Sequence, residues 1–229
     1  MIMCSIRSTL CILCFCCWSG IAAQQDFTTY FQPQIALNYK VSTGYSHNFS
    51  IGQRNYVYDE SDLQFKTRQI DLVHFSKLKI QDNQSLALGI QYRFRENFEP
   101  GKGNELRLTQ QYNITSKPRV ARLGHRVRSE QRITSALTIH RFRYRFAVDF
   151  PLNGEQLDIG EAYVVTSTES LLSVANGQGP EFDQRITGNI GWLLREKTKM
   201  QFGLEYRAEN YGQHTQKILF LNANLVLSL

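Results

Sequence analysis

The sequence predicts an all-β protein, an antiparallel transmembrane β-barrel of about 10–12 strands. Apolar side chains recur at every second position through most of the chain. Several of these alternating segments reach the roughly 9–11 residues that a tilted strand needs to cross a bilayer. The connections between them tend to alternate between short and long. A closed barrel satisfies every backbone hydrogen-bonding group inside a membrane without a helix, so these three observations favour a membrane barrel.

The stretch HRFRYRFAVDF, residues 140–150, shows the alternation most clearly. Every even position from 142 onward is apolar, and Arg141, Arg143 and Arg145 lie between them. In a helix these apolar positions would scatter around the axis, whereas in a strand they share one face. The segment is therefore expected to form a strand with an apolar face and a basic face.

The same pattern continues along the chain after residue 23, and no linker divides it. Bacterial single-chain barrels normally have an even number of strands, so the odd total found here suggests an error. Segments 63–80 and 156–168 are the least regular and are where we expect it. The eleven candidate strands are 27–40, 45–58, 63–80, 85–95, 105–113, 119–132, 136–150, 156–168, 185–194, 199–207 and 216–229.

The connections support two unequal barrel ends. KVSTG, QDNQ, TSKP, PLNGEQ and REKTK are short, whereas NFEPGKGN, ESLLSVANGQGPEF and AENYGQH are long. Aromatic residues near strand ends are typical of interfacial girdles, although strands of any kind are rich in aromatics. A soluble exported β-barrel or sandwich is the rival fold.

Residues 1–23 are expected to be a secretory signal peptide, which leaves residues 24–229 as the barrel domain. The leader has Arg7, a short apolar stretch and Ala22-Ala23 at its end. A membrane anchor would need a longer apolar run, and Phe15 before Cys16 argues against a lipoprotein signal. All five cysteines lie in the leader, so we expect no disulfide, no metal and no organic cofactor.

The charge and the motifs argue against two function classes. The net charge is +6, and removal of Arg7 leaves +5 without a basic run, so we expect no nucleic-acid partner. We also expect no enzyme activity, because G-x-S-x-G is absent and His125 and Ser129 would stand about 13 Å apart on one strand. The acidic loop YDESDLQ lacks the further ligands of a calcium site.

Four stretches carry a family resemblance. They are QQDFTTYFQPQIALNYKVSTGYSHNFSIGQR, RLGHRVRSEQR, HRFRYRFAVDFPL and FDQRITGNIGWLLREKTKMQFGLEYR. Together they resemble a family of bacterial outer-membrane barrel proteins catalogued as a domain of unknown function. The resemblance implies a barrel and an outer-membrane location, and it implies no established activity or catalytic residue. One departure is the last residue, Leu229, where such barrels commonly end in an aromatic residue.

The membrane barrel fixes the direction of the arginines. An arginine facing lipid at the midplane costs about 2–4 kcal/mol, so the basic faces should point into the lumen. This rule turns twelve arginines inward against four carboxylates, Glu105, Glu130, Asp149 and Glu205. The two richest strands follow one another and should form one basic wall. Its members are Arg122, Arg126, Arg128, Arg132, Arg141, Arg143 and Arg145.

Two interpretations of this basic wall stay open. Arginine–carboxylate ladders can simply fill and hold a narrow barrel. Guanidinium groups also bind carboxylates and phosphates, which would make the protein a small channel or binding barrel for anionic solutes, with outer-membrane lipid as its other partner. The alternatives are a structural or surface-interaction barrel acting through its loops and, less favoured, an outer-membrane lipid-modifying enzyme.

Overall fold

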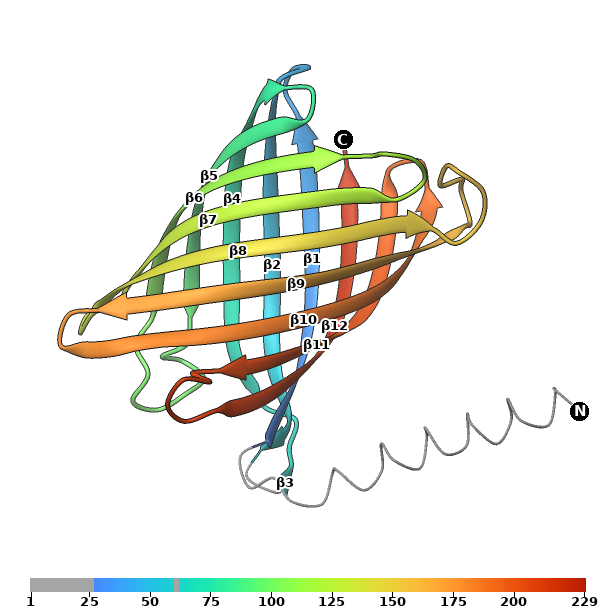
Figure 1. Cartoon of the computed structure of the whole chain (residues 1–229). Helices are drawn as coiled ribbons and strands as arrows, with labels where there is room; N and C mark the ends of the chain where they lie inside the picture. The colour runs from blue at the N-terminus through green and yellow to red at the C-terminus, as the bar shows by residue number, and fades with distance from the viewer. Residues whose placement is uncertain (1–26, 60–61) are drawn as a thin grey trace, which may run out of the picture.

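In the computed structural model, residues 27–59 and 62–229 form one closed β-barrel (Figure 1). The signal peptide and the cysteines assigned to residues 1–23 lie outside these described residues. The strands are β1 (Phe27–Lys40), β2 (Tyr45–Asp59), β3 (Asp62–Leu63), β4 (Thr67–Gln81), β5 (Gln84–Phe94), β6 (Glu105–Ser116), β7 (Arg122–Ile133), β8 (Thr138–Pro151), β9 (Ala162–Ala175), β10 (Gln178–Arg195), β11 (Thr198–Glu209) and β12 (Gln216–Ser228).

Eleven of these strands make the wall, which confirms the predicted fold class. The short β3 pairs only with the end of β2 and stands outside the barrel closure. Every consecutive pair in the wall is antiparallel, and β1 closes the barrel by pairing with both β2 and β12. An odd number of alternating strands brings the first and last together in the same direction, so β1 and β12 pair in parallel. The expectation of an even count was therefore wrong.

The two weakest candidate strands were indeed misplaced. The strand expected at 156–168 begins at Ala162 and continues to Ala175, through residues assigned to a long loop. Only Asn176 and Gly177 then separate β9 from β10, and Gly177 takes a positive φ of 73° that suits the tight turn. The candidate 63–80 begins later than expected, because Leu63 belongs to β3 and β4 starts at Thr67.

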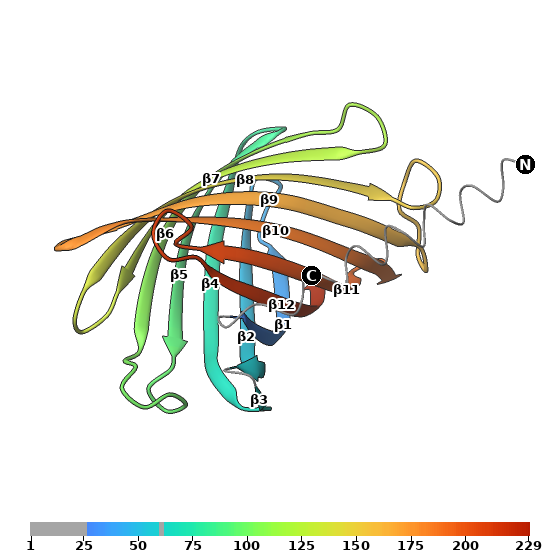
Figure 2. The same cartoon turned by 60° about the horizontal axis from the view of Figure 1, so that its bottom comes forward.

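The connections lie at two rims. The C-terminal rim carries the end of β12 with connections 41–44, 82–83, 117–121, 152–161 and 196–197, and the N-terminal rim carries the start of β1 with the others. Figure 2 shows the loops spread around both ends. The predicted alternation in length holds only in part, because the connection containing PLNGEQ runs from 152 to 161 while the 176–177 turn is short.

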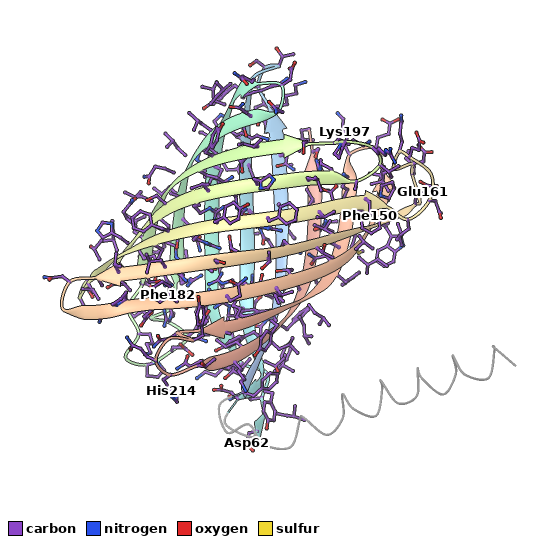
Figure 3. All side chains as sticks on the ribbon, viewed as in Figure 1. Asp62, Phe150, Glu161, Phe182, Lys197 and His214 are labelled. Carbon is purple, nitrogen blue, oxygen red and sulfur yellow. The ribbon has the colours of Figure 1, made fainter. Side chains whose placement is uncertain are left out.

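The two faces of the wall differ as the sequence predicts. Phe142 and Tyr144 on β8 are 50% and 46% exposed on the outside, whereas Arg141 between strands β7 and β9 is 5% exposed on the inside. Side chains cover both surfaces of the ribbon (Figure 3). No helix among the described residues is long and apolar enough to span a bilayer. The contrast between the two faces of β8 shows that the interior of the barrel is polar and contains buried charged side chains.

Candidate functional site in the barrel lumen

The barrel encloses a cavity of about 1820 Å³. Gly101 and His214, from loops at the N-terminal rim, contribute to its lining. Asn38 and Ser228, close to the C-terminal rim, also line it. The cavity therefore extends along the lumen from one rim to the other.

Two glutamates organise the charges on the β6–β9 side of the lumen. Glu130 is 1% exposed, and its carboxylate lies 3.4 Å from Arg143 Nη1, 3.6 Å from Arg107 and 4.0 Å from Arg132. The neighbouring Glu169 accepts a hydrogen bond of 2.7 Å from the other terminal nitrogen of Arg143. Arg143 thus bridges two buried carboxylates, which fixes its position on β8.

The network continues onto β10 and β11. Arg141 Nη2 donates a hydrogen bond of 2.7 Å to Asp183 Oδ2, and both side chains are buried. Arg185 lies within 4.0 Å of Glu169, Asp183 and Glu209. Arg185 reaches the adjacent strands β9 and β11, whereas Arg141 reaches Asp183 across the intervening β9. All these residues occupy alternate positions of their strands, which is where pleated strands place inward side chains.

The inward carboxylates are more numerous than the sequence predicted. Each carboxylate that the sequence analysis missed lies in a segment whose strand bounds were predicted incorrectly or that was predicted to be a loop. Glu169 was placed in a loop, Asp71 lay in an irregular segment, and Asp183 and Glu209 lie just beyond the predicted ends of their strands. The expectation of twelve arginines against four carboxylates was wrong, because Asp71, Glu99, Glu169, Asp183 and Glu209 also pair with inward arginines.

Six of the seven predicted wall residues line the cavity, and we call them the arginine wall: Arg126, Arg128, Arg132, Arg141, Arg143 and Arg145. The seventh, Arg122, does not line it. Its side chain is 57% exposed at the C-terminal rim and pairs with Asp149 at 2.8 Å. Arg122 is the first residue of β7, at the rim of the barrel, so its guanidinium reaches solvent.

Two members of the arginine wall lack a carboxylate within 4 Å among the residues described by the structure, Arg128 and Arg145. Arg128 donates from Nε to the side-chain oxygen of Gln111 at 3.0 Å and lies over the ring of Phe75. Arg145 stands opposite Arg126 in the β7–β8 register, and its Nε is buried without a hydrogen-bond partner. Arg145 also stands opposite Glu169 in the β8–β9 register, but that carboxylate is bound by Arg126 and Arg143. Like charges placed directly opposite repel, so the charge of Arg145 favours an additional anion here.

Arg54 is a third such arginine and was missed by the sequence analysis. Its Nε and Nη2 both donate to Gln32 Oε1, and its guanidinium lies 4.7 Å from the ring centroid of Phe220. No carboxylate of the described residues comes within 4 Å of it. Arg54 shares the inward parity of β2, so the alternation around Phe49 and Ile51 contained the signal.

The described residues hold no group of three metal-ligating side chains. His125, weighed as a catalytic residue, faces outward, where its Nδ1 lies 2.8 Å from the Tyr144 hydroxyl and its ring packs on Phe146. One acid of the calcium candidate, Glu60, lies outside the described residues.

A closed barrel of eleven mostly antiparallel strands, with a buried arginine–glutamate network in its lumen, defines the structural class of this protein. The chain belongs to the family described as "Protein of unknown function (DUF2490)", whose model matches residues 30–217. No curated protein matches the sequence. Two parts of the resemblance seen in the sequence are confirmed, the membership of a family of unknown function and the β-barrel fold.

Proposed function

We propose that the protein is a bacterial outer-membrane barrel that binds small anionic solutes in its lumen, or lets them pass. The observation that carries the proposal is the charge of the cavity lining. Thirteen arginines and two lysines line the cavity, against six carboxylates. Counting the ion-paired Glu99, Glu130, Glu169 and Glu205 as well, fifteen cations face ten anions. A lumen with this excess attracts anions.

The outer face supports the membrane part of the proposal. Strands of the wall run from 11 to 18 residues, long enough to cross a bilayer at a tilt. Exposed Ile35, Leu88 and Ile186 lie on β1, β5 and β10, which are separated from one another around the barrel. A protein in water rarely exposes apolar residues over so much of its surface, whereas lipid accepts them.

A second function has support from the ion pairs. Most lumenal arginines have a carboxylate partner, as expected if the network only holds the wall together. The loops at the two rims would then contact partners. Arg54, Arg128 and Arg145 favour the anion proposal over this alternative, because no carboxylate of the described residues lies within 4 Å of their guanidinium groups and their charge is left for a bound anion. We also propose that the protein is not an enzyme.

Two experiments test the proposal. Membrane insertion requires that the protein stay in the outer-membrane pellet after a carbonate wash, and its release would refute this part. In planar bilayers with a salt gradient, the reversal potential should show a preference for anions.

The variant Arg128→Gln/Arg145→Gln should weaken that preference, whereas Arg122→Gln, outside the cavity lining, should leave it unchanged. An unselective pore, or equal effects of the two variants, would leave the arginines as wall structure. A folded barrel that neither conducts nor binds anions would likewise show that the arginines only stabilise the wall.

A further inference from the structure

The side of the lumen facing the arginine wall is made by β1 and β2. In the ring of wall strands, β4, β5, β6 and β7 separate β2 from β8 in one direction. In the other direction β12, β11, β10 and β9 separate β1 from β8. The β1–β2 pair therefore stands directly across the barrel from β8, in agreement with Figure 1, where β1 and β2 lie behind the β7–β9 strands.

This opposite side carries neutral hydrogen-bonding groups. We call it the amide wall and define it as the lining residues Gln34, Asn38, Ser46, Asn48 and Ser50. Charged lining residues of β1 and β2, Arg54 and Asp59, lie nearer to the N-terminal rim. From Arg54 to the C-terminal rim the other lining residues of these two strands are Gly52 and His47, so amides and hydroxyls predominate here and neither strand adds a carboxylate, lysine or arginine to the cavity.

Much of the hydrogen-bonding capacity of the amide wall is unused within the protein. Asn48 Nδ2 donates to Asn38 Oδ1 at 2.8 Å, which leaves the other groups of both amides facing the cavity. Gln34, Ser46 and Ser50 have no side-chain hydrogen-bond partner among the described residues. Amides and hydroxyls each donate and accept, so they match hydroxyl groups, which also do both.

We propose that the solute is a hydroxylated anion, of the class of sugar acids and sugar phosphates. The arginine wall takes the carboxylate or phosphate, and the amide wall hydrogen-bonds the hydroxyls. A site with hydrogen-bonding groups for a substrate hydroxyl discriminates against an analogue that lacks it. This inference rests on the proposed function, because it assigns the anion to the same lumen.

The test compares two anions of similar ring size and equal charge, glucuronate and cyclohexanecarboxylate. Titration calorimetry of the purified barrel in detergent measures binding without requiring conductance. We expect glucuronate to bind at least about fivefold more tightly, the factor that one net hydrogen bond of ordinary strength provides. Glucose 6-phosphate against inorganic phosphate repeats the comparison for the phosphate class.

The variant Asn38→Leu/Asn48→Leu removes both members of the hydrogen-bonded amide pair and should abolish the preference for glucuronate. Thr166→Val, an exposed outer-face change on β9, is the control and should retain it. The wild-type comparison stands by itself if the double variant does not fold. Equal binding of the two anions, weakened by Arg128→Gln/Arg145→Gln, would overturn this inference and leave the anion proposal intact. No binding of either anion would overturn this inference, and together with a bilayer recording that shows no anion preference it would overturn the proposed function as well.

Discussion

Tyr30 lies directly opposite Phe220 across the parallel pairing of β1 and β12, with the two ring centroids 5.2 Å apart. Both rings are buried, and Ile218 completes a small apolar cluster with them. The guanidinium carbon of Arg207 lies 3.8 Å from the centroid of the Phe220 ring. The strand pair that closes the barrel is thus held from the lumen side by the tilted contact of the two rings and by the Arg207 guanidinium over Phe220.

Loss of this ring should open the closure. We expect Phe220→Ala to lower the free energy of unfolding by about 3–5 kcal/mol, because the ring is 1% exposed and its removal leaves a cavity. Denaturant unfolding in detergent, followed by the gel shift of the folded barrel, measures the loss. Phe202→Ala on the outer face of β11, 47% exposed, is the control. Equal losses for the two variants would show that the seam has no special stability.

Glu130 should matter far more than a rim carboxylate. We expect Glu130→Gln to cost about 3–5 kcal/mol, since it leaves the buried guanidinium groups of Arg107 and Arg143 without this counter-charge. The control Asp149→Asn breaks the exposed pair with Arg122 and should cost about 0–1 kcal/mol. Denaturant midpoints of the two variants compare them directly. A rim variant as damaging as the buried one would contradict the assignment of Glu130 as the organising charge.

Two glycines on neighbouring strands, Gly203 on the inward face of β11 and Gly188 on the outward face of β10, contrast lumen packing with the open outer surface. A Cβ at Gly203 on β11 would stand 2.5 Å from the carbonyl oxygen of Gly188, which is backbone and cannot rotate away. Gly203→Ala should therefore destabilise the barrel by about 1–3 kcal/mol. Gly188 on β10 has open space at its own Cβ position, so Gly188→Ala should fold normally. The yield of folded barrel and its unfolding midpoint report both effects, and a tolerated Gly203→Ala would mean that the two strands stand further apart.

Glu99 should hold the β5–β6 loop against the lumen. Tyr56 donates a hydrogen bond from its hydroxyl to Glu99, and the Nε of Arg68 and that of Arg95 lie 3.5 Å and 3.6 Å from its carboxylate. Lys102 in the same loop lines the cavity.

We expect Glu99→Gln to loosen the loop, so that trypsin cleaves after Lys102 faster than in the wild type. Glu96→Gln, an exposed change in the same loop, keeps a side-chain oxygen that accepts the hydrogen bond from Asn104 Nδ2 and should leave the cleavage rate unaltered. Mass spectrometry of the fragments identifies the cut. A rate that does not respond to Glu99 would assign the loop's position to its backbone contacts.

Alternation identified the strands whose outer face is continuously apolar, such as β5 and β8, and it gave the inward direction of the arginines. It failed where the outer face is itself polar. In β9, Thr166, Thr168 and Ser170 lie outside, so the predicted strand stopped at residue 168 and Glu169 was assigned to the following loop. The other missed acids have different causes, because Asp71 lay in an irregular segment, Glu99 in a loop, and Asp183 and Glu209 beyond the predicted ends of their strands. Whether an arginine has a partner depends on the register between strands, which the sequence of one strand does not contain.

The parallel closure of β1 with β12 also decides where the chain enters and leaves the barrel. An even number of antiparallel strands returns the chain to the rim at which it started, whereas eleven take it across. Phe27 and Ser228 accordingly stand at opposite rims. If the barrel spans a membrane, the start of β1 and the end of β12 therefore face opposite compartments. Epitopes fused before β1 and after β12 would then report on opposite sides of the same bilayer.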